Sequence, residues 1–419
     1  MFIFFCIHLR EIPYTMTKQT ISPQSDRLES VDALRGFALL AILLLHSLEH
    51  YNIFYGNAPR PEWIQMLDAK TTEFLYFLFA GKAYATFSLL FGFSFFIQMR
   101  NARRRGSDFR LRFAWRMLLL VGFSQFHALF YNGDILLLYA VCGLILIPAS
   151  SWSNRTVIIV ATILMLQPLC WAKIIYALIN PEYVDTNSEF VKYAIAAEQV
   201  GRNGNLWQTL ANNIWNGQLY SNFWQVEAGR LFQTPALFLI GMWLGRKSLF
   251  VNSAESLAFW KRAAVCAVVA CVPLYLLKEL VPPHISNVTI LSYYGIAIPM
   301  LYNFAFMTVL VSGFMLLWFH AGNGYKAQRF ISPFGRMSLT NYIGQSIIGV
   351  ILYYHFGFDL WDKTGAFESV IIAAVVFVFM LTFSRKWLET HRQGPLEYLW
   401  KKGTWINFRP EEKQGKAIA

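Results

Sequence analysis

An arginine and a histidine in the first long apolar stretch of the chain, Arg35 and His46, have the spacing of a two-ended site. In one α-helix, at about 100° and 1.5 Å per residue, the two side chains would share a face about 16 Å apart. Arginine binds phosphate through paired hydrogen bonds, and neutral imidazole suits general-base work near neutral pH. The pair predicts a helix face that binds an anion at one end and moves a proton at the other.

Further ionisable side chains lie in or beside apolar stretches, where they are costly and usually face an internal cavity. The predicted catalytic group in the outer half consists of His46, His50, His127 and Asp134. Glu49 is expected to orient an imidazole, and Lys82 to pair with a carboxylate or line a wet cavity. The alternative is that these groups make polar contacts between helices or form an interfacial turn.

A second polar group is expected at the cytoplasmic mouth, where it would hold a phosphate-bearing ligand. Its members are Arg35, Arg112, Arg116, Arg336 and Asn341, and Gln345 is expected to line the cavity about one turn beyond Asn341. The alternative makes Arg35 a cationic anchor at the membrane surface and gives Asn341 and Gln345 hydrogen bonds between helices.

Several kinds of chemistry find no support in the sequence. HExxH, P-loop and GxSxG motifs are absent, which removes the basis for a metalloprotease, an ATPase or a serine hydrolase. The five cysteines are scattered without a CxxC pair and are interpreted as small core residues. A metal ion bound by His46, Glu49 and His50 is the alternative, but no metal is predicted.

The elements that must position these residues are membrane helices. Of the 419 residues, 56% are hydrophobic and only 14% are charged, against about 25% charged in a soluble domain. We predict an all-α, polytopic bundle of about ten transmembrane helices, each needing about 20 apolar residues. The expected spans are 35–55, 74–99, 112–131, 134–150, 156–179, 232–250, 261–280, 295–319, 337–356 and 367–388.

The cationic residues predict the orientation of this bundle. Most Lys and Arg fall in alternate connections between the spans, which the positive-inside rule places in the cytoplasm together with both termini. This accounts for most of the net charge of +12, so no nucleic acid partner is needed. The expected divisions are a cytoplasmic lead-in at 1–30, whose true start we place at Met16, a membrane domain at 31–388 with an outer loop at 180–229, and an interfacial cytoplasmic tail at 389–419.

Five blocks in order resemble the YeiB-type membrane-protein family, which carries a domain of unknown function numbered 418. They are Asp32–Ala38; Gly81–Phe93; Gly122 through His127 to Ala140; Gly335–Tyr342 with Gln345; and Arg392–Glu397 with Trp400. This family is grouped by resemblance with transmembrane acyltransferases. The acyltransferase-three enzymes of that group carry an Arg, ten residues and a His in their first span, and Arg35 and His46 match this spacing. The YeiB-type family often has Asn where His46 stands.

The resemblance implies a bacterial cytoplasmic membrane and an acyl group moved from cytoplasmic acyl-CoA to a small-molecule or glycan acceptor on the far side. In that hypothesis Arg35, with Arg116 or Arg336, binds the phosphates of acyl-CoA, and His46 activates the acceptor. The alternative is a transporter that passes a small anionic solute or a lipid through the same cavity. A scaffold without chemistry would leave the charges inside the spans unexplained.

Overall fold

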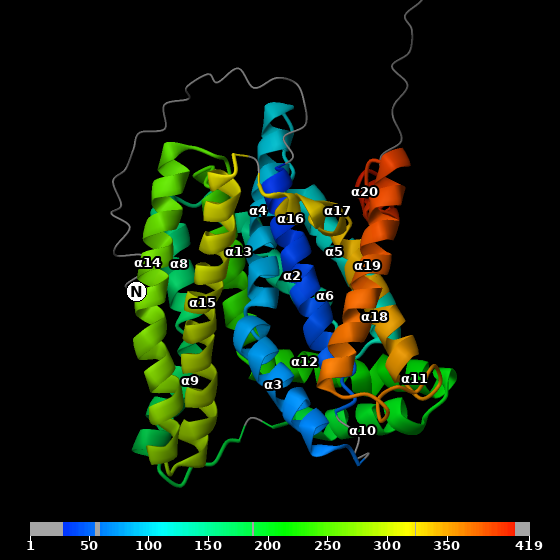
Figure 1. Ribbon diagram of the computed structural model, residues 1–419. Helices are drawn as coiled ribbons and strands as arrows, with labels where there is room; N and C mark the ends of the chain where they lie inside the picture. Colours follow the sequence, from blue (N-terminus) through cyan, green and yellow to red (C-terminus); the bar gives the residue numbers. More distant parts are fainter. Residues whose placement is uncertain (1–27, 55–58, 187, 323, 407–419) are drawn as a thin grey trace, which may run out of the picture.

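A computed structural model describes residues 28–54, 59–186, 188–322 and 324–406. Every regular element in these ranges is a helix, which confirms the all-α fold class (Figure 1). Residues 1–27, which include the proposed start at Met16, and residues 407–419 of the expected tail lie outside the described part of the chain.

Seven of the expected spans coincide with helices that are long and apolar enough to cross a membrane, which makes this a membrane protein. Six stand by themselves, and a seventh is formed if the pair α8–α9, bent by 45°, is one span. The six are α2 (Glu29–Leu48), α3 (Glu62–Phe79) continuing into α4 (Ala83–Arg104), α5 (Arg110–Phe130), α14 (Ala254–Leu280) continuing into a 3-10 turn (Pro282–His284), α15 (Val288–His320) and α19 (Ala366–Thr390). The bent pair is α8 (Asn154–Met165) with α9 (Pro168–Ile179).

The other three expected spans hold shorter helices, so the count of ten stays a prediction. They are α6 (Leu136–Gly143) with α7 (Leu146–Ala149), α13 (Arg230–Arg246) and α18 (Ser338–Tyr353). The ends of α7 and α13 are hydrogen-bonded to each other on one side of the bundle, and the end of α18 is hydrogen-bonded on the opposite side. Arg246 donates to the carbonyls of Ala149 and Trp152 (both 2.8 Å), whereas the backbone N–H of His355, just after α18, donates to Gly201 (3.1 Å).

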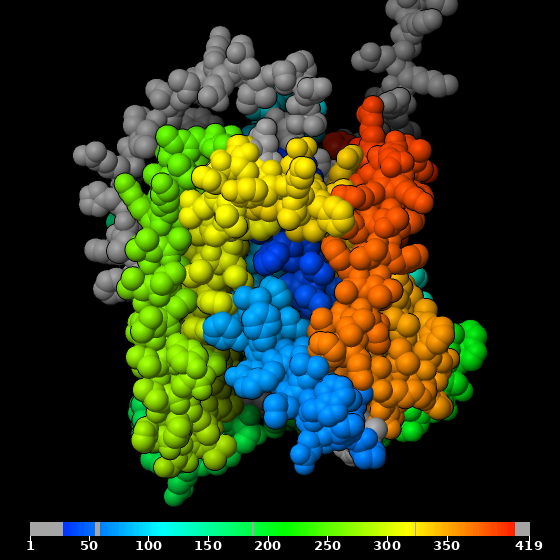
Figure 2. All heavy atoms as spheres, in the orientation of Figure 1, coloured from blue at the N-terminus to red at the C-terminus, as the bar shows by residue number. Residues whose placement is uncertain are grey.

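The expected outer loop forms a layer of helices across the bottom of the bundle in Figure 1. It contains α10 (Phe190–Asn203), α11 (Leu206–Asn212), a π-helix (Asn213–Gly217) and α12 (Gln218–Glu227). The opposite end carries α16 (Lys326–Phe330), α17 (Ser332–Arg336) and α20 (Pro395–Thr404). Helix α2 runs between these two ends and is visible only in a gap between α3, α16–α17 and α19 (Figure 2).

Glycines let the helices around α2 approach closely. A Cβ on Gly92 of α4 would stand 1.9 Å from the carbonyl oxygen of Phe238 in α13, and one on Gly241 of α13 would stand 1.8 Å from that of Leu89. Gly92 has a packing role, because no larger residue fits where two backbones touch. This contact fixes α4, which carries one side of the inner cavity, against the buried helix α13.

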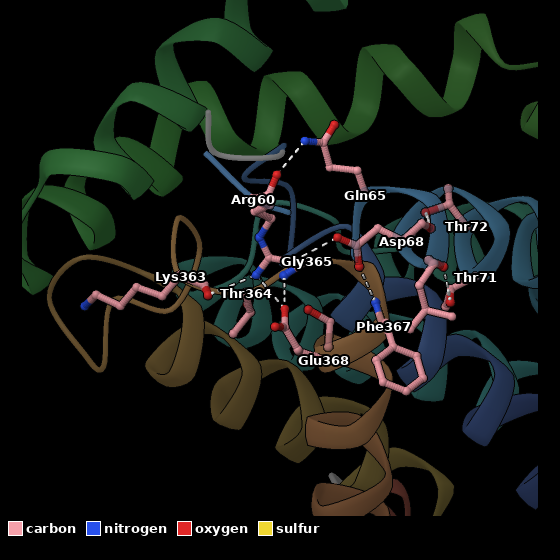
Figure 3. A network of polar contacts seen from close by, with 12 residues as sticks. Arg60, Gln65, Asp68, Thr71, Thr72, Lys363, Thr364, Gly365, Phe367 and Glu368 are labelled. Carbon is pink, nitrogen blue, oxygen red and sulfur yellow. Dashed lines mark hydrogen bonds and ion pairs between the residues drawn. The ribbon is translucent and has the colours of Figure 1, made fainter. Parts of the chain in front are cut away.

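A polar network joins the outer ends of α3 and α19 (Figure 3). Arg60 donates to Asp68 of α3 (2.9 Å) and to Glu368 of α19 (2.6 Å). Asp68 also accepts from the backbone N–H of Phe367 (2.9 Å), and Glu368 accepts from that of Gly365 (2.6 Å). The network therefore holds the two helix starts together beside the outer end of α2.

Candidate functional site

Arg35, in the second turn of α2, lines an inner cavity of about 160 Å³. Its guanidinium donates to Asp32 Oδ1 (2.8 Å) and to Ser94 Oγ on α4 (2.6 Å). Phenyl rings, including those of Phe91 and Phe113, form much of the remaining wall. An arginine oriented in this way at an apolar cavity can bind an anionic group more strongly than it would in water.

Arg116 of α5 lines the same cavity, and α20 forms the wall beside it. Its guanidinium lies 4.0 Å from the ring centroid of Trp400 and donates to Thr404 Oγ1 (3.2 Å). Trp400 Nε1 in turn donates to the backbone carbonyl of Arg116 (3.1 Å). Arg112 donates to the Thr404 carbonyl (2.9 Å) and lies over Trp405, so it binds α20 and does not line the cavity.

Arg336 lines a separate surface cavity of about 490 Å³ at the same end of the bundle. It donates to the backbone carbonyl of Arg392 (2.6 Å). Asp32 belongs to this lining and also pairs with Arg35, so an ion pair separates the two cavities. The charged lining residues are Glu29, Asp32, Arg329, Arg336, Arg385 and Glu389.

His46 and Glu49 line an outer cavity of about 290 Å³ near the other end of α2. His46 Nδ1 lies 2.9 Å from the hydroxyl of Tyr131 and 3.8 Å from Glu49 Oε2. Glu49 accepts a hydrogen bond from the hydroxyl of Tyr76 (2.7 Å). The imidazole is therefore held by a phenol beside a carboxylate, an arrangement that can orient a base toward a ligand in the cavity.

His127 and Asp134 form a buried pair at the turn between α5 and α6. His127 Nδ1 lies 2.7 Å from Asp134 Oδ1, and Asp134 Oδ2 accepts from Ser124 Oγ (2.5 Å) and from the Leu137 N–H (3.2 Å). His127 Nε2 has no hydrogen-bond partner among the described residues. The His127 ring lies 5.7 Å from the ring of Tyr131, which also contacts His46, so Tyr131 connects the two histidines.

The structure separates His50 from the other members of the predicted catalytic group. The prediction assumed a helix continuing past His46, but α2 ends at Leu48 and His50 has a φ of 46°. Its fully buried ring stacks on Tyr353 (4.8 Å) and its Nε2 lies 3.0 Å from Ser369 Oγ. His50 therefore contacts α18 and α19 and does not line the outer cavity.

Lys82 also lies away from the outer cavity. Gly81, with a φ of 75°, interrupts the helix between α3 and α4, and the buried ammonium of Lys82 lies over the rings of Tyr302 (5.5 Å) and Phe306 (5.3 Å) of α15. Among the described residues, its Nζ has no carboxylate within 4 Å. Aromatic faces, which attract cations, take the place of the expected carboxylate or wet cavity.

Asn341 and Gln345 line neither the inner nor the outer cavity. Asn341 Nδ2 donates to the Phe334 carbonyl (2.8 Å) and to Ser384 Oγ (3.0 Å), so the side chain joins α17, α18 and α19. This is the alternative role, a polar contact between helices. The Gln345 side chain is fully buried, and its amide has no hydrogen-bond partner within the described ranges.

Tyr342 of α18 lines both the inner and the outer cavity. Arg35 and His46 thus border two cavities near opposite ends of α2, and the two cavities meet at one buried tyrosine ring. The rings of Tyr139 on the inner side and Tyr84 on the outer side lie in the same region, where the Tyr139 hydroxyl donates to the Tyr84 carbonyl (3.2 Å). Tyrosine side chains therefore separate the inner cavity from the outer cavity.

The outer cavity contains one cation that the sequence prediction did not include, Arg230, the first residue of α13. Its position before an apolar helix resembles that of an ordinary surface anchor, so the sequence carried no signal of a cavity. No group of three or more His, Cys, Asp or Glu side chains in the described ranges could hold a metal ion. Cys142, Cys170, Cys266 and Cys271 are free thiols, and Cys6 lies outside the described residues.

The fold and the two cavities define a helical membrane protein with separate polar sites near the two ends of one central helix. A family model described as "Protein of unknown function (DUF418)" matches residues 244–407. Together with the relatives below, this match confirms the resemblance to the YeiB-type DUF418 family. No solved structure matches the chain.

Three bacterial relatives are similar over nearly the whole chain. The uncharacterized protein YxaH of Bacillus subtilis (strain 168) is 26% identical over 430 residues, which cover 94% of this chain and 98% of the relative. An uncharacterized 39.9 kDa protein from the amylase 3' region of Bacillus acidopullulyticus is 27% identical, with 91% and 94% covered. The uncharacterized protein YeiB of Escherichia coli (strain K12) is 25% identical, with 90% and 96% covered.

Proposed function

We propose that this protein transfers an acyl group from cytoplasmic acyl-CoA to the hydroxyl of an acceptor bound in the outer cavity. The supporting observation is the pair of cavities along α2, with Arg35 in one, His46 in the other and Tyr342 in both. We place the protein in a bacterial cytoplasmic membrane, with the Arg35 end inward. Membrane lipids surround it, and the acceptor is a small molecule or a glycan.

On the donor side, Arg35 and Arg116 would bind the anionic part of the donor nearest the membrane. The inner cavity of about 160 Å³ is smaller than pockets that enclose drug-sized ligands, about 300–1,000 Å³. It therefore has room for part of the pantetheine arm, and the nucleotide would lie outside. The adjoining surface cavity, with Arg336 among its cations, offers the remaining phosphates a place. Asn341 would act only by holding the start of α18.

On the acceptor side, His46 would take the proton of the acceptor hydroxyl as the oxygen attacks the thioester carbonyl. The new C–O bond forms, the C–S bond breaks, and the proton passes from His46 to the leaving CoA thiolate. The side chains of Tyr84, Tyr139 and Tyr342 must move apart for the thioester to reach the outer cavity. His127, oriented by Asp134, is the second candidate base, and its use requires Tyr131 to move as well.

Transport of a small anionic solute or a lipid is the second candidate function. The observation that favours it is the same meeting of two cavities at Tyr342, because opening that junction would join the cavities into one passage. A transporter would bind its solute without cleaving a thioester. Acyl-CoA binding and hydrolysis therefore separate the two proposals.

The experiment measures acetyl-CoA binding and hydrolysis by the purified protein and its variants. Arg35→Ala should weaken binding by about tenfold or more, because a hydrogen bond to a charged group contributes about 1.5–3 kcal/mol. His46→Ala should leave binding within about twofold and lower turnover by about 10²–10⁴-fold. Arg155→Ala and His320→Ala, at exposed positions of α8 and α15, are the matched controls and should behave as the wild type.

One result would contradict acyl transfer, and a second would reassign the base. A wild-type protein that neither binds nor hydrolyses any acyl-CoA would favour transport. Turnover that survives His46→Ala but is lost in His127→Ala would keep the reaction and move the base to the buried pair.

A further inference from the structure

Arg230 is held in the outer cavity by two aromatic side chains. Its guanidinium carbon lies 4.2 Å from the ring centroid of Tyr84 in α4 and 4.1 Å from that of Trp224 in α12. All three residues line the outer cavity together with His46 and Glu49. Rings at these distances stabilise the cation and restrict its movement, which reduces the entropy lost when the guanidinium binds a ligand.

No carboxylate in the described ranges pairs with this charge. Within the described residues, no hydrogen bond or ion pair involves the Arg230 side chain, in contrast to Arg35, Arg60 and Arg202, which each have a carboxylate partner. A half-buried guanidinium between aromatic faces can still use its N–H groups for paired hydrogen bonds. Carboxylate and phosphate are the groups that match this geometry.

The cavity has opposite charges on different walls. Glu49 is hydrogen-bonded to Tyr76 and lies beside His46, and no ion pair joins it to Arg230. The first residues of α4, Ala83 and Tyr84, also belong to the lining, and the start of a helix favours negative charge. A ligand with its anionic group at Arg230 could therefore present an uncharged hydroxyl to His46.

We infer that the outer cavity binds a small hydroxylated molecule carrying a phosphate or a carboxylate, with Arg230 as the anion-binding residue. The cavity volume of about 290 Å³ lies at the lower limit of ligand pockets, which favours a molecule of monosaccharide or glycerol-headgroup size. The aromatic side chains of Tyr76, Tyr131, Tyr220 and Trp224 line it with surfaces on which such a molecule can pack. This inference rests on the proposed function for the role of the ligand as acyl acceptor, but its binding does not require acyl transfer.

The test measures binding to the purified full-length protein in the absence of acyl-CoA. The soluble probes are glucose 6-phosphate and glucuronate, with uncharged glucose for comparison, and calorimetry gives their affinities. A second arm uses nanodiscs of phosphatidylcholine with and without phosphatidylglycerol, and native mass spectrometry detects retained lipid. The first arm reports a soluble ligand and the second a lipid headgroup with the same chemistry.

We expect at least one anionic probe to bind the wild type at least about tenfold more tightly than glucose or phosphatidylcholine does. Arg230→Gln should remove this preference, because a hydrogen-bonded charge pair contributes about 1.5–3 kcal/mol. Arg230→Lys should keep part of it, since lysine keeps the charge but lacks the planar paired donors. Lys192→Gln removes an exposed outer cation paired with Glu189 and should leave binding unchanged.

Anion binding that is equal in the wild type and in Arg230→Gln would overturn the inference, as would the absence of binding to every anionic probe. If Arg230→Gln does not fold, Arg230→Lys decides the question, because wild-type affinity in that variant would contradict paired recognition. Loss of acyl-CoA binding in Arg35→Ala does not enter this test. Failure of the proposed acyl transfer and failure of the anion site are therefore separate results.

Discussion

Two imidazoles in the outer half of the molecule are held in different ways, and this sets what each can do. His46 borders a cavity and contacts a phenol and a carboxylate, so it can reach a bound ligand. His127 is fully buried with Nδ1 against Asp134, so its orientation is fixed but a ligand can reach it only after a rearrangement. In the proposed reaction we therefore expect His46 to act as the base before His127 does.

The buried carboxylate of Asp134 gives a prediction at this scale. Asp134→Asn preserves the shape of the side chain but removes its charge and replaces one carboxylate oxygen by an amide N–H, so Ser124, His127 and Leu137 all keep their contacts only if His127 Nδ1 accepts. We expect a loss of about 3 kcal/mol of stability, as for other broken buried pairs. The apparent melting temperature of the purified protein checks this.

Asp108→Asn is the matched control, because Asp108 pairs with Arg110 at an exposed position and surface ion pairs contribute little. We expect its melting temperature to equal that of the wild type. If Asp134→Asn melted at the same temperature as Asp108→Asn, the His127 contact would have no structural role.

Residue types and spacing predicted the side chains whose position depends only on their own helix. Arg35 and His46 lie on one regular helix, and each borders a cavity near its end of α2. His50 and Lys82 depend on where a helix stops, which is set by residues with positive φ that the sequence pattern did not reveal. The two rings that flank Arg230 belong to Tyr84 and Trp224 on other helices. The role of Arg230 could therefore not be predicted from its own helix.

At the scale of elements, the contact between α4 and α13 depends on the absence of side chains. Gly241→Ala would place a Cβ 1.8 Å from the backbone oxygen of Leu89, so the two helices must separate. Gly295→Ala on α15 is the matched control, since its Cβ would have no heavy atom within 4 Å. Alanine is favoured over glycine in a helix by up to about 1 kcal/mol, so this control should be neutral or stabilising.

We expect Gly241→Ala to lower the apparent melting temperature and Gly295→Ala to leave it unchanged or raise it. Because α4 borders both cavities and packs on α13 at this contact, acetyl-CoA binding should also weaken in the first variant. Equal melting temperatures for the two variants would show that the helices adjust without cost. The apolar stretches predicted that these helices exist, but only the structure shows which backbones touch.

At the scale of the whole molecule, the clustered cations gather at one end of the bundle. Arg329 pairs with Glu29 (3.4 Å), Arg112 donates to Thr404, and Arg246 donates to Ala149, so segments far apart in the sequence share this end. The positive-inside rule predicts that this is the cytoplasmic end. The long apolar helices were predictable from hydropathy, whereas α6–α7, α13 and α18 are shorter, so their crossing of the membrane stays a prediction.

The predicted path of the chain through the membrane can be tested by cysteine labelling in a variant whose five native cysteines are replaced. A membrane-impermeant maleimide applied to intact cells should label Asn203→Cys and His355→Cys, on the outer layer and just after α18. Ser107→Cys and Ser151→Cys, on either side of the α5–α7 hairpin, should react only after permeabilisation. All four positions are exposed, so differences in labelling report their side of the membrane. Labelling of Ser151→Cys in intact cells would mean that 134–150 does not cross, and the reverse pattern at all four positions would invert the orientation and place Arg35 at the outer end.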